Sequence, residues 1–190
     1  NNENSISFIE IYNIQNLDEK SSNNEPILAP SISHHIFNSS KKYNYDIKFK
    51  AHSIYNDEGY DIKRWSGIGK IDKKIDLTNI SLEAETNVGV DLYSIQGRPS
   101  SDSNDNRYVD RISSGFSIAA SNQYGFINDV SHFIIEPKIQ FSSVFSPDRT
   151  EEIPNRDSTE FRLDQANLFL NNQFQGRDNI QENDKINLGI

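Results

Sequence analysis

Residues 80–92 read ISLEAETNVGVDL, an unbroken alternation between two kinds of side chain. The even positions hold mostly apolar or β-branched residues: Ile80, Leu82, Ala84, Thr86, Val88, Val90 and Leu92. The odd positions hold polar or small residues: Ser81, Glu83, Glu85, Asn87, Gly89 and Asp91. Because successive side chains of a strand point to opposite faces, this pattern predicts a long strand with one apolar and one charged face.

Residues 43–55 (YNYDIKFKAHSIY) alternate in the same way, with Asp46, Lys48, Lys50 and His52 in the polar row. Less regular alternation predicts further strands at 5–13, 27–37, 60–71, 108–120, 133–141 and 185–190. The polar row of the strand at 133–141 consists of Glu136, Lys138 and Gln140. No stretch has the 3.6-residue period of an amphipathic helix, so the sequence predicts an all-β, antiparallel, up-and-down fold.

The predicted strands are about 9–13 residues long, which exceeds the usual 5–6 and approaches the 9–11 of a membrane-spanning strand. The alternation within residues 60–71 is interrupted at Arg64 and Trp65. Predicted connections at 14–26, 56–59, 94–107 and 146–184 share one end of the sheet, and all but 56–59 are long. Those at 37–42, 72–76 and 121–130 share the other end and are shorter than these long ones. Long external loops opposite short periplasmic turns are typical of transmembrane outer-membrane β-barrels, which we favour over a soluble sandwich or solenoid.

In such a barrel the apolar rows face lipid, because a lysine or arginine at mid-depth on the lipid face costs about 2–4 kcal/mol. The polar rows are then predicted to face the lumen. The predicted lumen-facing residues are Asp46, Lys48, Lys50, His52, Glu83, Glu85, Asn87, Asp91, Glu136, Lys138 and Gln140.

The composition excludes several classes of function. A formal net charge of −9 argues against nucleic-acid binding, which needs cations to neutralise phosphates. The chain has no cysteine, so thiolate metal sites, thiol nucleophiles and disulfides are excluded within these residues. The four histidines lack partners at metal-ligand spacing, and Glu83 and Glu85 read as solvated neighbours on a polar face. We therefore expect neither an enzyme nor a cofactor.

The longest predicted connection contains Ile153–Asp178, IPNRDSTEFRLDQANLFLNNQFQGRD, which has no sustained period of 2 or 3.6. It follows a strand-like stretch at 132–145 and is longer than an ordinary connection. Its proline, glycine and aromatic residues predict a packed external loop that caps the lumen.

This connection and the strand before it resemble the LPS-assembly protein LptD family, also called the organic solvent tolerance protein family. The resemblance rests on an Ile-Glu-Pro step, an Ile-Pro-Asn-x-Asp-Ser segment, an Asn-Leu-Phe run and a final Phe-x-Gly-x-Asp. The matching residues are Glu136, Pro137, Pro154, Asn155, Asp157, Ser158, Asp164, Asn167, Leu168, Phe169, Phe174, Gly176 and Asp178.

The resemblance implies a partial barrel domain over residues 1–190, with about seven to eight strands of a much larger barrel in the Gram-negative outer membrane. It also implies transport of lipopolysaccharide (LPS) into the outer leaflet. The implied partners are LPS, an LptE-like plug lipoprotein and the periplasmic LPS-bridge proteins. A small autonomous porin-like barrel and a soluble β-rich binding module remain open as alternatives.

Overall fold

The computed structural model shows an all-β chain built around one long-stranded sheet. It describes residues 3–13, 27–40, 43–55, 60–97, 106–127, 132–149, 152–155, 157–160, 167–172, 174–180 and 182–190. None of these residues forms a helix long and apolar enough to cross a membrane.

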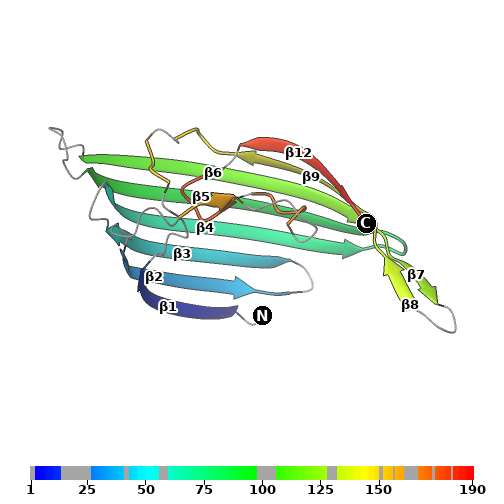
Figure 1. Ribbon diagram of the computed structural model, residues 1–190. Coiled ribbons are helices and arrows are strands. Elements are labelled where there is room, and N and C mark those ends of the chain that lie inside the picture. The colour runs from blue at the N-terminus through cyan, green and yellow to red at the C-terminus, as the bar shows by residue number, and fades with distance from the viewer. Residues whose placement is uncertain are drawn as a thin grey trace.

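Eight antiparallel strands form the main sheet, in the order β1-β2-β3-β4-β5-β6-β9-β12 (Figure 1). Their bounds are β1 Glu3–Asn13, β2 Ile27–Asn38, β3 Asn44–Tyr55, β4 Tyr60–Asp76, β5 Ser81–Gly97, β6 Asn106–Ser121, β9 Lys138–Phe145 and β12 Asn183–Gly189. Two small hairpins pair β7 (Tyr124–Ile127) with β8 (His132–Ile135), and β10 (Thr159–Glu160) with β11 (Phe174–Gln175). Neighbours in the main sheet follow one another along the chain apart from these hairpins, which confirms the predicted up-and-down topology.

The curved sheet has two ends, which we name by their connections. The long-loop end carries the connections after β1, β3, β5 and β9, and the short-turn end carries those after β2, β4 and β6. Within the described residues, β1 and β12 form the two edges of the sheet, and β1 pairs with β2 while β12 pairs with β9.

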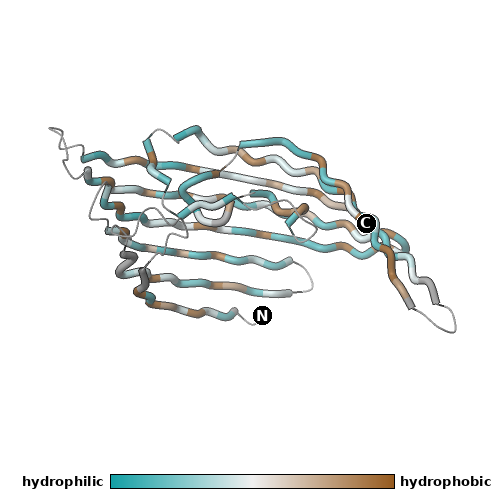
Figure 2. Tube along the Cα trace, in the orientation of Figure 1, coloured by the Kyte–Doolittle hydropathy of each residue, from teal (hydrophilic) through white to brown (hydrophobic). Residues whose placement is uncertain are grey.

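The pairing register sorts the side chains onto two faces. Directly opposed residues share a face, so the pairs Lys48↔Ile68, Asp46↔Lys70 and Asp91↔Arg111 define a polar face. The opposite, apolar face leaves large side chains exposed along every strand of the sheet from β3 to β12. Examples are Phe49, Trp65, Ile71, Val88, Leu92, Ile112, Ile118, Phe141 and Ile186. Hydrophobic and hydrophilic residues alternate along the strands in Figure 2.

The turn predicted at 72–76 is wrong. Residues 72–76 belong to β4, and the turn lies at 77–80, where the Leu77 backbone N–H donates to the Ile80 carbonyl at 2.9 Å. The charged residues of 72–76 pair with the first part of β5, Lys74 opposite Glu83 and Asp76 opposite Ser81. The polar content of 72–76 therefore reflects the charged rows of a strand and not a turn.

The continuous strand predicted at 133–141 is also wrong, because it divides at Glu136 and Pro137. β8 pairs with β7 in a hairpin that projects from the short-turn end, and β9 begins only at Lys138 (Figure 1). Proline has no N–H for the ladder, and its carbonyl accepts from the Asn122 backbone N–H at 3.3 Å instead. The predicted loop at 121–130 accordingly contains the strand β7.

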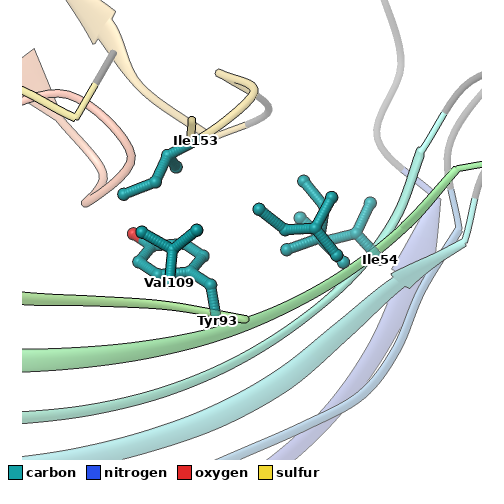
Figure 3. Packing of buried hydrophobic residues seen from close by; sticks show 6 residues of the cluster. Ile54, Tyr93, Val109 and Ile153 are labelled. Atoms are coloured by element: carbon teal, nitrogen blue, oxygen red, sulfur yellow. The ribbon is translucent and has the colours of Figure 1, made fainter. Parts of the chain in front are cut away.

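The apolar core is small and lies over the polar face at the long-loop end (Figure 3). There the inward rows of β3 to β6 become apolar, and Ile153 packs on them from the connection after β9. The cluster consists of Ile54, Ile62, Tyr93, Ile95, Val109 and Ile153. This contact brings the long connection back onto the sheet.

Candidate functional site on the polar face

The register places ten of the eleven predicted lumen-facing residues on the polar face. The exception is Glu136, which lies between β8 and β9 and accepts a hydrogen bond from Gln123 Nε2 at 2.9 Å. The ten residues are Asp46, Lys48, Lys50, His52, Glu83, Glu85, Asn87, Asp91, Lys138 and Gln140. Whether this face borders a lumen stays a prediction.

Opposite charges meet on the polar face, between the neighbouring strands β4 and β5 and, across β6, between β9 and β5. Lys70 Nζ lies 2.7 Å from Glu85 Oε2, and Lys138 Nζ lies 3.2 Å from Glu83 Oε2. The Lys70 and Glu85 side chains are 40% and 21% exposed, so water screens this pair and its contribution to stability is small. The face is therefore both wet and nearly balanced in charge where these pairs lie.

Arg64 on β4 is the centre of a much drier cluster. Its side chain is 1% exposed and its two terminal nitrogens reach two different carboxylates. Nη1 donates to Asp178 Oδ1 at 2.7 Å, and Nη2 donates to Asp157 Oδ2 at 2.5 Å. Both aspartates belong to the long connection, so one strand arginine holds two segments that are separated by about twenty residues of chain.

Arg111 and Asp91 extend this cluster to β6 and β5. Asp91, which is fully buried, accepts from Arg111 Nη2 at 3.0 Å and from Arg177 Nη2 at 2.7 Å. Arg111 Nη1 donates to the Asp178 carbonyl at 2.7 Å, and its Nη2 donates to the Arg177 carbonyl. The Tyr93 hydroxyl accepts from Arg111 Nη2 at 3.0 Å and donates to Asp178 Oδ1 at 3.3 Å.

We call these residues the loop anchor, because they join the sheet to the long connection. The loop anchor consists of Arg64, Asp91, Tyr93, Arg111, Asp157, Arg177 and Asp178.

The two aspartates of the connection also bind its backbone. Asp157 Oδ1 accepts the N–H groups of Arg177 at 3.0 Å and Asp178 at 2.9 Å. Asp178 Oδ2 accepts the N–H of Asp157 at 2.9 Å. Burial raises the pKa of Asp157, but the Arg64 guanidinium and the two backbone donors outweigh it, so this pKa lies well below its ordinary value of 3.8. The carboxylate is thus held in its charged form.

Local turns shape the two arms of the connection. Asn155 Oδ1 accepts from the Ser158 N–H at 2.9 Å, and the Ser158 hydroxyl accepts from the Asn179 N–H at 2.8 Å. Gly176 has a φ of 93°, in the left-handed region that favours glycine. A Cβ there would also collide with the Asp157 carbonyl. These contacts explain why the two arms need an Asn, a Ser and a Gly at these positions.

The connection continues along the polar face toward the short-turn end. The Phe169 carbonyl accepts from Gln140 Nε2 at 3.0 Å, and its ring lies 5.1 Å from Lys138 Nζ. Asn171 Nδ2 donates to Glu85 Oε1 at 3.1 Å. The described parts of the segment are therefore packed along the polar face, and the predicted role as a cap of the lumen stays a prediction.

The structure places the remaining motif residues around these contacts. Pro154 is half-buried beside Ile153, Phe174 pairs with Glu160 in the small hairpin, and Leu168 lies against Gly189 together with Phe169. Asn167 is described and half-buried, whereas Asp164 lies outside the described residues.

Of the loop anchor, sequence reasoning singled out Asp91, Asp157 and Asp178 and missed Arg64, Tyr93, Arg111 and Arg177. The alternation predicted to be interrupted at Arg64 and Trp65 is in fact continuous, because Arg64 lies in the polar row of β4 and Trp65 in the apolar row. An arginine in the polar row was the signal that could have pointed to the loop anchor. Among the described residues, no group of His, Asp or Glu side chains is arranged to hold a metal ion.

Long antiparallel strands with an exposed apolar face, and with a polar segment packed on the charged face, are typical of the outer-membrane β-barrel class. Residues 1–190 match the family model described as LptD: LPS transport system D, and the chain belongs to this family. The family consists of Gram-negative outer-membrane proteins that bind LPS and work in its transport, and they are not enzymes. A comparison with curated proteins finds no match.

Proposed function

We propose that this chain forms a section of the barrel wall of an LPS translocon in the outer membrane. In this proposal the apolar face contacts lipid and the polar face lines the lumen. Residues 1–190 are then part of one large barrel, whose partners are an LptE-like plug and the periplasmic LPS-bridge proteins.

The observation that carries the proposal is the inverted distribution of side chains between the two faces. Phe49 and Val88 are 52% and 51% exposed on one face, whereas Arg64, Asp91 and Arg111 are at most 3% exposed on the other. A soluble sheet would bury its apolar face and expose its charges. This chain exposes its apolar face and covers part of its charged face with its own long connection, as a wall between lipid and a polar lumen requires.

The polar face suits the passage of the sugar part of LPS. Its exposed groups alternate in charge, as in the Lys70–Glu85 and Lys138–Glu83 pairs, and offer donors and acceptors to hydroxyls and phosphates. The segment around Phe169 lies over these pairs, so it narrows the space above them. The chain's own role in this proposal is to guide the sugar part of LPS along the polar face and to restrict its path.

Photo-crosslinking in the full-length protein tests the proposal at neighbouring positions of one strand. A crosslinking amino acid at Glu85 lies on the polar face, and one at Ala84 lies exposed on the apolar face. We expect LPS adducts at position 85 and phospholipid adducts at position 84. Equal LPS labelling at both positions, or none at 85 in a correctly assembled protein, would contradict the assignment of faces.

Charge reversal gives a second test. Glu83→Lys with Glu85→Lys should slow the appearance of LPS at the cell surface, at unchanged protein level. Asp184→Lys is the matched control, because Asp184 is exposed on the other face, opposite Ser143. Asp91 is unsuitable for this test, since its reversal would also break the loop anchor.

A further inference from the structure

The apolar face carries a groove over β4. The groove lies beside glycine residues that the packing of the sheet does not require. Two consecutive outward positions of β4 are glycines, Gly67 and Gly69, between Trp65 and Ile71. A Cβ on Gly69 would meet nothing within 4 Å, and one on Gly67 would make an ordinary 3.7 Å contact with the Phe49 ring. Neither glycine has a left-handed φ, so neither is demanded by the backbone.

Glycine in a strand interior is unfavourable and often marks a place where another molecule approaches the backbone closely. Here the approach is from the lipid side, because Gly69 is opposite Ile47 on β3 and Val88 on β5, both on the apolar face. The resulting groove has a volume of about 480 Å³, which falls within the range of small-ligand sites. Gly69 lies in its lining and Gly67 lies outside it. The lining consists of Tyr43, Tyr45, Ile47, Gly69, Lys70, Ile71, Thr86, Asn87 and Val88.

A cation lies on the same strand at the short-turn end of this groove. Lys73 is exposed, and its pairing with Ala84 places it on the apolar face. It is four residues from Gly69, about 13 Å along an extended strand. The described apolar-face rows of β3, β4 and β5 contain one carboxylate, Asp61. It lies at the other end of β4 from Lys73.

We propose that this groove binds one glycerophospholipid, with an acyl chain over Gly69 and the phosphate beside Lys73. The Tyr43 side chain, 45% exposed at the same end, supplies an aromatic ring and a hydroxyl at the depth of the lipid head group. The inference rests on the proposed function, since it takes the apolar face to be in the bilayer. A phospholipid is the occupant because short turns mark the periplasmic end and the cation faces no nearby described acid.

The test uses the full-length protein, extracted from its membrane in mild detergent and weighed by native mass spectrometry. The wild type should retain a phospholipid, and Gly69→Leu should lose it, because the new side chain fills the groove. Lys73→Gln should retain less than the wild type. Ala120→Leu is the matched control: it adds a similar side chain on the same face, on β6 two strands from β4 and outside the groove, and should retain the lipid.

Gly69→Leu is informative because it is not expected to disturb folding. The added side chain meets no neighbour at its Cβ, so the thermal midpoint of the variant should equal or exceed that of the wild type. Equal phospholipid retention by Gly69→Leu and wild type would overturn the proposal, and so would retention of LPS in place of phospholipid. LPS delivery measured on the same variant separates the two ideas: normal delivery with unchanged lipid retention rejects the groove and leaves the translocon proposal standing.

Discussion

Replacing Arg64 with glutamine should release the long connection from the sheet. The arginine supplies the only strand guanidinium that reaches both Asp157 and Asp178 in the described contacts, at 2.5 and 2.7 Å. Glutamine keeps much of the aliphatic stem but has no charge and no forked pair of donors. The substitution therefore removes both ion pairs while changing the packing little.

The magnitude follows from how dry each carboxylate is. Removing one partner of a buried ion pair costs about 3–5 kcal/mol, because a charge is left without compensation. The Asp178 side chain is 2% exposed, so losing its arginine partner costs nearly the full amount. The Asp157 side chain is 18% exposed and keeps contact with water and with two backbone donors, so its loss costs less. We therefore expect a loss of about 3 kcal/mol, at the lower end of that range.

Amide hydrogen exchange of the full-length protein measures this loss locally. A destabilisation of 3 kcal/mol corresponds to about a hundredfold faster exchange, since each 1.4 kcal/mol is a factor of ten. The acceleration should appear at the N–H groups of Asp157, Arg177 and Asp178, which are bonded within the anchor. The strands at the short-turn end should exchange at the wild-type rate.

Two controls decide whether the reasoning is right. Arg149→Gln removes an arginine of the same connection that pairs with Glu152 at the surface, and it should leave exchange unchanged. Asp178→Asn alone should be strongly destabilising, yet the double variant with Arg64→Gln should cost clearly less than the sum of both singles. Additive effects, or exchange within threefold of wild type in Arg64→Gln, would refute the account of a shared buried charge.

Three further predictions concern the same anchor. Gly176→Ala should cost about 1–3 kcal/mol in unfolding free energy, because alanine is strained at a φ of 93° and its Cβ collides with backbone. Gly89→Ala should cost about 1 kcal/mol, less than Gly176→Ala, since its Cβ at 2.5 Å from Arg177 Nη2 displaces a flexible side chain; a chemical denaturation series ranks the two. The pKa of Asp157 is lowered on folding, so its stabilising contribution is complete above about pH 3.8 and is lost as the pH falls through the lower, folded value. Unfolding free energies between pH 5 and 2 should show this loss in the wild type, and Asp157→Asn should flatten the profile in that window.

The alternation of side chains predicted the two faces because it depends only on neighbouring residues. Glu85, Asn87 and Asp91 share the polar face as residues 80–92 indicate, and the register of β5 with β4 and β6 agrees. The same rule failed where a charged row was mistaken for a turn, at 72–76. Charged residues are common to exposed strand ends and to turns, so composition alone does not separate the two there.

The loop anchor was beyond prediction from pattern, because its partners are far apart in the chain. Arg64 and Asp178 are separated by 114 residues, and no local period links them. The motif residues Asn155, Asp157 and Gly176 were singled out through a family resemblance, but the reason for each is a contact with the other arm or with the sheet. Only the folded chain shows that Asp157 is at once a partner of Arg64 and a cap for two backbone N–H groups.

Ion pairs can hold the long connection on the sheet and leave the alternation of polar and apolar residues along the strands intact. An apolar anchor would need apolar side chains in the polar rows of β4 to β6. Both faces of those strands would then have the same apolar character. The difference between the faces is what fixes which one meets the bilayer, since a shift of one residue exchanges them.

Arg64, Asp91 and Arg111 keep the polar row polar and still bind the connection. The forked guanidinium of Arg64 also selects one geometry, because both of its terminal nitrogens are paired only when Asp157 and Asp178 are in place. A lysine has a single ammonium group and lacks this fork. The anchor therefore specifies one arrangement of the segment on the inner face, at a place where the apolar cluster around Ile153 reaches only the long-loop end.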